Sequence, residues 1–144
     1  EPEDGLRVLK QTGCDGLMLG RGVWGRPWLF REIDETVKHG RVVTPTPGPL
    51  ERLCVLREHF EMLVETFDVG TSCQVVRRYA TWYVKDIAGS PQFRARLTRV
   101  NSREEFHEIV DEITQHFERA VGVPEDEWVG RRQTQSEPAL QTVG

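Results

Sequence analysis

The sequence predicts a mainly α-helical protein, in which a piece of an α/β fold precedes a four-helix bundle. The run from Gly16 to Leu19 is short, apolar and closed by Gly20, so it indicates a buried strand. The segment from Thr44 to Pro49 holds three prolines and one glycine, so it marks a boundary. From Leu50 to Gly122 apolar residues recur at helical spacing.

Composition limits the class of protein. The chain has 144 residues, enough for one domain or slightly more, and its hydrophobic content of 38% is low for burying a single core. It opens at Glu1 without a methionine, and a lone strand has no sheet to join, so we expect the C-terminal piece of a longer protein. No stretch approaches the roughly 18 to 20 apolar residues of a membrane span, and the histidines show no metal-ligand spacing. Cys14, Cys54 and Cys73 lack a Cys-x-x-Cys pair, which favours a reducing cytoplasm.

The pattern in the first region, residues 1–40, predicts a helix, a strand, a glycine-rich turn and a second helix. The two helices are expected over Asp4 to Gln11 and Pro27 to Lys38, each followed by a glycine. Glycines in the turn allow close approach of a ligand. Backbone amides at a helix start, with Arg21 and Arg26 beside them, predict a site for a phosphate group. A merely tight connection is the alternative for this turn.

The region from residue 50 to 122 is expected to form four helices behind a proline-rich linker over residues 41–49. The first helix ends at Gly70, and the last begins with a capping box formed by Ser102 and Glu105. Short loops between amphipathic helices predict a small bundle. Residues 123–144 have few apolar residues among polar residues and two prolines, so we expect a disordered tail. The four helices should cover Leu50 to Val69, Ser72 to Ala88, Ser90 to Val100 and Ser102 to Ala120.

Positive charge is concentrated on the middle of this bundle. Between Gln74 and Arg103 there are seven cationic side chains against one acid, Asp86, although the whole chain carries a net charge of −4. This distribution predicts a polyanion-binding face, called the basic face below. Its cations are Arg77, Arg78, Lys85, Arg94, Arg96, Arg99 and Arg103.

The second helix of the bundle adds an aromatic ring to these cations. Arg78, Trp82 and Lys85 follow one another at spacings of four and three, away from the expected core. A ring among cations suits stacking on an unpaired base with phosphates alongside. In the alternative, Trp82 packs at the edge of the bundle, and the cations form a solvated face that pairs with neighbouring acids. Those acids are Glu58, Glu61, Glu65, Glu108, Asp111 and Glu112.

Two motifs together resemble one family. The first runs from Gly13 through Gly20-Arg21-Gly22 to Ile33 and is similar to the last barrel strand and following helix of the tRNA-dihydrouridine synthases, nearest the bacterial nifR3-like group. The second, Val76 to Lys85, is similar to the helix that usually reads Arg-Lys-His followed by Trp-Tyr and Lys-Gly in that family. The resemblance spans roughly residues 1 to 120 and identifies the first region as the end of a truncated (β/α)8 TIM barrel.

The resemblance implies an oxidoreductase that reduces the C5=C6 bond of selected uridines in tRNA. FMN in the barrel gives hydride, NADPH recharges the flavin, and a cysteine on an upstream loop protonates the base. Gly20 and Arg21 match the pair that binds the FMN phosphate, where TIM barrels commonly bind phosphate. Four residues match the tRNA-facing helix, and the basic face adds three more. The expected tRNA ligands are Arg77, Arg78, Trp82, Lys85, Arg94, Arg96 and Arg99.

Departures from the family pattern limit this comparison. The family's histidine is Tyr79 here, and its glycine after the lysine is Asp86, so no role is carried over to either position. None of the three cysteines matches the catalytic one, and the chain contains no catalytic residue that the resemblance assigns. We therefore expect the polypeptide alone to be inactive and not to hold FMN.

Two other functions are compatible with the sequence. The first is a non-catalytic helical module whose basic face binds an acidic protein partner. The second is another flavin-dependent barrel enzyme acting on a small molecule, which leaves the Arg-Trp-Lys pattern unexplained. The modified uridine and the oligomeric state do not follow from the sequence.

Overall fold

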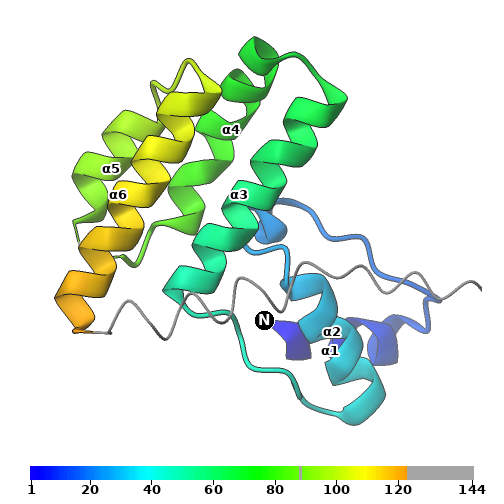
Figure 1. Ribbon diagram of the computed structural model, residues 1–144. Coiled ribbons are helices and arrows are strands. Elements are labelled where there is room, and N and C mark those ends of the chain that lie inside the picture. Colours follow the sequence, from blue (N-terminus) through cyan, green and yellow to red (C-terminus); the bar gives the residue numbers. More distant parts are fainter. Residues whose placement is uncertain (88, 123–144) are drawn as a thin grey trace, which may run out of the picture.

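The chain folds into two helical parts that lie against each other, as seen in a computed structural model that describes residues 1–87 and 89–122 (Figure 1). Two helices form the first part, and four nearly aligned helices form the second. A short 3₁₀ turn, η1, lies between α1 and α2. The helices are α1 (Pro2–Thr12), α2 (Leu29–His39), α3 (Pro49–Thr66), α4 (Val69–Tyr83), α5 (Ser90–Leu97) and α6 (Arg103–Val121), and η1 covers Arg21–Val23.

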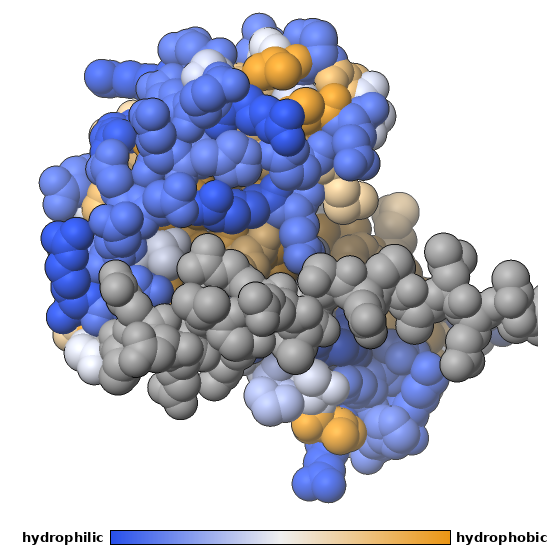
Figure 2. Space-filling model, in the orientation of Figure 1, coloured by the Kyte–Doolittle hydropathy of each residue, from blue (hydrophilic) through white to orange (hydrophobic). Residues whose placement is uncertain are grey.

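The expected four-helix bundle is present. Helix α3 packs on α4 and α6, and α5 packs on α4 and α6, so the apolar stripes of all four helices meet in one core. At its centre the rings of Phe60 and Phe106 stack with centroids 4.0 Å apart. The opposite, outward faces are polar, and Figure 2 shows hydrophilic residues over most of the visible bundle surface. Core residues include Leu53, Leu56, Val76, Ala80, Leu97, Ile109, Val110 and Ile113.

Side-chain caps set two of the helix starts. Asp68 accepts a hydrogen bond from the amide of Thr71 at 3.0 Å and so begins α4 at Val69. The prediction that Gly70 ends the preceding helix is therefore wrong, because Gly70 lies in the first turn of α4 and α3 ends at Thr66. At the start of α6, Ser102 accepts from the amide of Glu105 as expected.

The first part is a pair of packed helices, α1 and α2, with Leu17 of the connecting segment beside them. Gly5 of α1 is buried, and a β-carbon there would lie 3.0 Å from Ile33 of α2 and 3.1 Å from Leu17. A larger side chain would therefore separate these three segments.

The expected strand at Gly16 to Leu19 does not form, and no strand occurs in residues 1–87 or 89–122. The segment has no regular secondary structure and Met18 is 97% exposed, because no second strand is present to pair with its backbone groups. The helical content of the rest agrees with the expected fold class. The domain boundaries stay predictions, and the expected disordered tail at residues 123–144 lies outside the described residues.

Candidate nucleic-acid interface

The glycine-rich turn lies directly on α4. Gly25 is buried at a φ of 67°, and a β-carbon there would lie 2.3 Å from the Cβ of Trp82. Next to it, the rings of Trp24 and Tyr79 lie edge to face with centroids 5.5 Å apart. Only glycine tolerates both the backbone angle and this contact without strain. The turn and the helix that resembles the tRNA-facing helix are therefore neighbours in space.

Arg21, at the start of this turn, is exposed, and its guanidinium lies 5.8 Å from the centre of the Trp24 ring. It makes no ion pair within the part of the chain that the structure describes. Gly20 precedes it with open space around it. Arg26, which the sequence placed beside the same phosphate site, instead forms ion pairs with Glu32 at 2.9 Å and Glu1 at 3.6 Å. The structure thus leaves Arg21 as the available cation of the turn.

Beside the contact between this turn and α4, an apolar cavity of about 520 Å³ is lined by both the turn and the bundle. Phe30 and the turn form one wall, and α3 and α4 form the other. Inside it, His59 stacks on Tyr79 with centroids 5.8 Å apart, and its Nδ1 lies 3.3 Å from the hydroxyl of Tyr83. Burial lowers the pKa of His59 and raises that of Tyr83 to about 12, so both are neutral near pH 7.

Arg96 and Arg103 of the basic face are paired with acids of the neighbouring helices. Arg96 makes two hydrogen bonds to Glu112 of α6, which lowers the pKa of Glu112. Arg103 binds Glu61 of α3, and Oε1 of Glu61 also lies 2.7 Å from His107 Nε2. Although burial acts in the opposite direction, the hydrogen bonds from Arg103 and His107 lower the pKa of Glu61. These two arginines therefore pair with neighbouring acids, as the solvated-face alternative expects, and the role of Arg96 in tRNA binding stays a prediction.

Arg77 has a different environment. Its Nε donates to the main-chain oxygen of Val100 at 2.9 Å, and its Nη2 donates to the side-chain oxygen of Asn101. Both acceptors are neutral, so the side chain is held in place while its positive charge remains uncompensated. Arg77 thus joins α4 to the loop that follows α5.

Arg78, Arg94 and Arg99 make no side-chain hydrogen bond or ion pair anywhere in residues 1–87 and 89–122. Together with Arg77 they are the uncompensated arginines below. Trp82 is 52% exposed, and Lys85 is exposed in the turn after α4. The nearby acid, Asp86, lies 3.7 Å from Arg52 of α3. The arrangement therefore offers separate cations and one exposed indole ring, which suits phosphates and a base.

Sequence reasoning missed the polar connection between α3 and α6. The side chain of His107 on α6 contacts two residues of α3. Its Nε2 lies next to Glu61, and its Nδ1 lies 3.1 Å from Nη1 of Arg57. Arg57 also pairs with Asp111. These contacts join residues about 50 positions apart, so no local spacing marks them.

Residues 1–87 and 89–122 contain neither a candidate membrane span nor a candidate metal site. No helix there has both the length and the apolar character needed to cross a membrane. No group of three or more histidine, cysteine or acidic side chains there is arranged to hold a metal ion.

Comparisons with known proteins identify the family. The sequence model for dihydrouridine synthase (Dus) matches residues 1–121. The chain is 34% identical over 119 residues to tRNA-dihydrouridine synthase B of Yersinia pestis, covering 82% of this chain and 36% of that protein. It is 35% identical over 99 residues to the Pseudomonas aeruginosa protein of that name, covering 69% and 30%. It is also 31% identical over 139 residues to a probable tRNA-dihydrouridine synthase of Mycobacterium leprae, covering 96% and 35%.

The chain belongs to the dihydrouridine synthase family. The membership predicted from the two motifs is confirmed. The chain spans about a third of the length of these curated relatives.

Proposed function

We propose that this chain is part of a flavin-dependent tRNA-dihydrouridine synthase, in which its helical bundle binds tRNA. The family match over residues 1–121 supports the enzyme class. The observation that carries the binding role is the set of uncompensated arginines on a chain that is acidic overall. Such cations attract phosphates without first breaking an internal ion pair.

The residues of the basic face and Trp82 have different roles in this proposed binding. Arg78, Arg94 and Arg99 are exposed or half-exposed and reach phosphates as point contacts. Trp82 supplies a flat apolar surface on which an unpaired base stacks. Arg96 contributes little, because Glu112 already compensates its charge. Lys85 adds a further cation in the turn after α4.

The turn fits one end of FMN. Arg21 has an exposed guanidinium with no carboxylate partner in the described residues, and Gly20 leaves open space next to it. These two residues would hold the phosphate of FMN. When bound, FMN supplies the hydride for reduction of the uridine C5=C6 bond, and NADPH restores it.

Gly20 and Arg21 would hold only the phosphate end of FMN. We expect no stoichiometric FMN binding by this chain alone, and no dihydrouridine above background when it is mixed with FMN, NADPH and unmodified tRNA. Cys14, Cys54 and Cys73 form no disulfide among the described residues, which supports a cytoplasmic location.

Titration of labelled tRNA at several salt concentrations tests the binding role. We expect the logarithm of the affinity to fall linearly with the logarithm of the salt concentration, because phosphate contacts release counterions. Arg78→Ala and Arg99→Ala should each weaken binding and reduce the magnitude of the salt slope by about 1. Arg96→Ala is the matched control, since its guanidinium is already paired with Glu112.

Three results would contradict the proposal. The first is no binding of tRNA at low salt. The second is the same salt slope for the wild type and for the Arg78→Ala and Arg99→Ala variants. The third is a loss of tRNA affinity in Arg96→Ala as large as in those two variants. If an acidic polypeptide competes as well as tRNA does, the basic face instead binds an acidic protein partner.

A further inference from the structure

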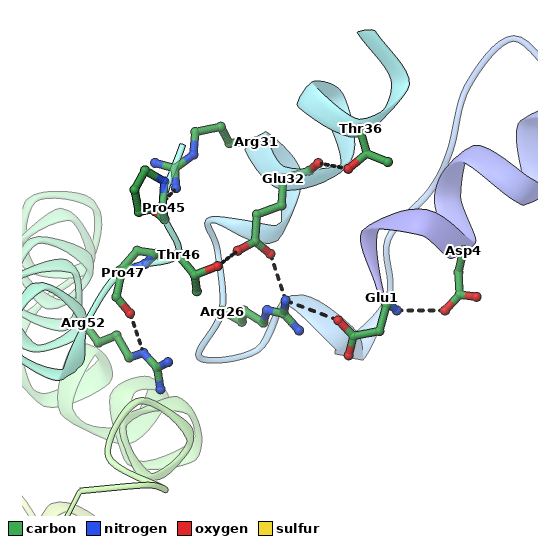
Figure 3. A network of polar contacts seen from close by, with 10 residues as sticks. All are labelled: Glu1, Asp4, Arg26, Arg31, Glu32, Thr36, Pro45, Thr46, Pro47 and Arg52. Atoms are coloured by element: carbon green, nitrogen blue, oxygen red, sulfur yellow. Dashed lines mark hydrogen bonds and ion pairs between the residues drawn. The ribbon is translucent and has the colours of Figure 1, made fainter. Parts of the chain in front are cut away.

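The buried carboxylate of Glu32 lies where three segments meet (Figure 3). Glu32 is on α2 and only 1% exposed. Arg26 of the glycine turn donates to its Oε2 at 2.9 Å, and the hydroxyl of Thr46 donates to its Oε1 at 2.7 Å. A buried carboxylate requires such partners because it has lost its hydration. Each oxygen of Glu32 therefore fixes a different segment to α2.

A second carboxylate, Glu35, holds the same proline-rich segment one turn further along α2. Its Oε2 accepts from the amides of Val43 at 2.8 Å and Thr44 at 2.9 Å, and its Oε1 accepts from the Thr44 hydroxyl at 2.5 Å. Arg31 adds a hydrogen bond to the main-chain oxygen of Pro45 at 3.2 Å. Residues 43 to 46 are thus bound to α2 at successive positions.

The other end of the segment is fixed to the bundle. Arg52 of α3 donates from Nε to the main-chain oxygen of Pro47 at 2.9 Å. Its guanidinium also lies 5.5 Å from the centre of the Trp28 ring, and Trp28 is part of the bundle core. Prolines remove backbone freedom between these two attachments. Residues 41–48 therefore have the features of a rigid strut rather than those of a flexible linker.

We propose that Glu32 is a positioning residue, which fixes the orientation of the glycine turn relative to the bundle by binding Arg26 and Thr46 together. Through Arg26 it holds the turn that carries Arg21, and through Thr46 it holds the strut that leads to α3. If the proposed function is correct, this sets the spacing between the phosphate-binding turn and the basic face that binds tRNA. The orientation itself does not depend on that function.

Distance measurement between two spin labels in the full chain tests this proposal. The labels go on Lys10→Cys of α1 and Gln115→Cys of α6, both exposed, in a Cys14→Ser, Cys54→Ser background, with buried Cys73 retained. We expect one narrow distance distribution for the wild type. Glu32→Ala should broaden this distribution. Its width should not exceed a value on the order of 15 Å, which is reached if residues 41–48 behave as free coil. Thr46→Val, which removes only the strut contact, should broaden it less.

Controls separate positioning from general loss of structure. Asp34→Asn changes an exposed acid on the same helix that pairs only with Lys38 among the described residues, and should leave the distribution narrow. Glu32→Gln keeps the shape and an acceptor oxygen, so it should restore much of the narrow distribution. Helical circular dichroism should be equal for all variants. The tRNA affinity of Glu32→Ala should stay within about twofold, since the uncompensated arginines are unchanged.

An unchanged distribution in both Glu32→Ala and Thr46→Val would overturn the proposal. Broadening in Asp34→Asn equal to that in Glu32→Ala would overturn it too. If Glu32→Ala does not fold, the result for Thr46→Val decides. Failure of tRNA binding in every variant, with the distance changes present, would refute the proposed function and leave the positioning role standing.

Discussion

The two parts of the molecule are stabilised by different interactions. The bundle has a continuous apolar core, in which Phe60 and Phe106 are fully buried. The first part has few buried apolar side chains and instead buries Glu32 and Thr36 of α2. It is fixed by hydrogen bonds to a carboxylate and by close contacts at Gly5 and Gly25. Apolar packing tolerates small changes, whereas these contacts depend on single atoms.

This difference predicts where substitutions have large effects. In the bundle the cost should follow the apolar volume removed. In the first part and at its junction with α4 the cost should follow steric fit and the loss of specific polar partners. Three predictions test this contrast, in order of decreasing effect.

The largest effect is expected for Phe60→Ala in the bundle core. The Phe60 side chain is 0% exposed and stacks on Phe106, so its removal leaves a cavity. The free energy of unfolding should fall by about 3–5 kcal/mol, measured by urea denaturation. Phe67→Ala is the control, since Phe67 is 49% exposed at the end of the same helix and should cost less than about 0.5 kcal/mol. Equal losses for the two variants would contradict the core assignment.

The next effect is expected for Gly25→Ala at the junction of the two parts. The left-handed backbone of residue 25 alone should cost about 1–2 kcal/mol in the variant. The new methyl group would also lie 2.3 Å from Trp82, so the turn must move away from α4. Urea denaturation measures the loss of stability, and protease digestion measures exposure of the turn. Gly16→Ala, which meets no atom within 4 Å, should be close to neutral; if both variants behave alike, the junction is not as tight as described.

Local sequence signals predicted the bundle well and the junction poorly. The helical spacing and the Ser102 cap are properties of consecutive residues, and the structure confirms them. The expected strand at Gly16 to Leu19 needs a second strand to pair with, which local sequence does not supply.

The candidate site shows the same limit. The sequence located the basic face, but it did not tell Arg96, which is paired with Glu112, from Arg99, which makes no ion pair in the described residues. Nor did spacing reveal that Glu32 is buried, since its partners come from a turn and from a segment 14 residues away. The pairing of Arg96 and the burial of Glu32 both depend on residues far away in the sequence, so no short motif predicts them.

The smallest effect should appear on mild acidification, and it should affect the bundle before the strut. Burial holds the pKa of His59 below its ordinary value of 6.5, so the unfolded chain binds a proton there more readily than the folded one. Its contribution to stability is present above pH 6.5 and is lost as the pH falls towards its lower folded value. The strut behaves differently, because hydrogen bonds from Thr44 lower the pKa of Glu35 to about 2. That contribution persists down to about pH 4.5 and is lost only as the pH falls towards 2.

Urea denaturation between pH 7.5 and 5 should therefore show that the free energy of unfolding decreases as the pH falls. The decrease should be smaller than the limit of about 1.4 kcal/mol per pH unit for one proton. His59→Phe should decrease less steeply over this range than the wild type, while His39→Phe, at the exposed end of α2, should match the wild type. Glu35→Gln should keep the wild-type slope here and differ only below about pH 4.5, because Glu35 is ionised in both states above that value. A wild-type slope in His59→Phe would show that the bundle does not disfavour the charged imidazole.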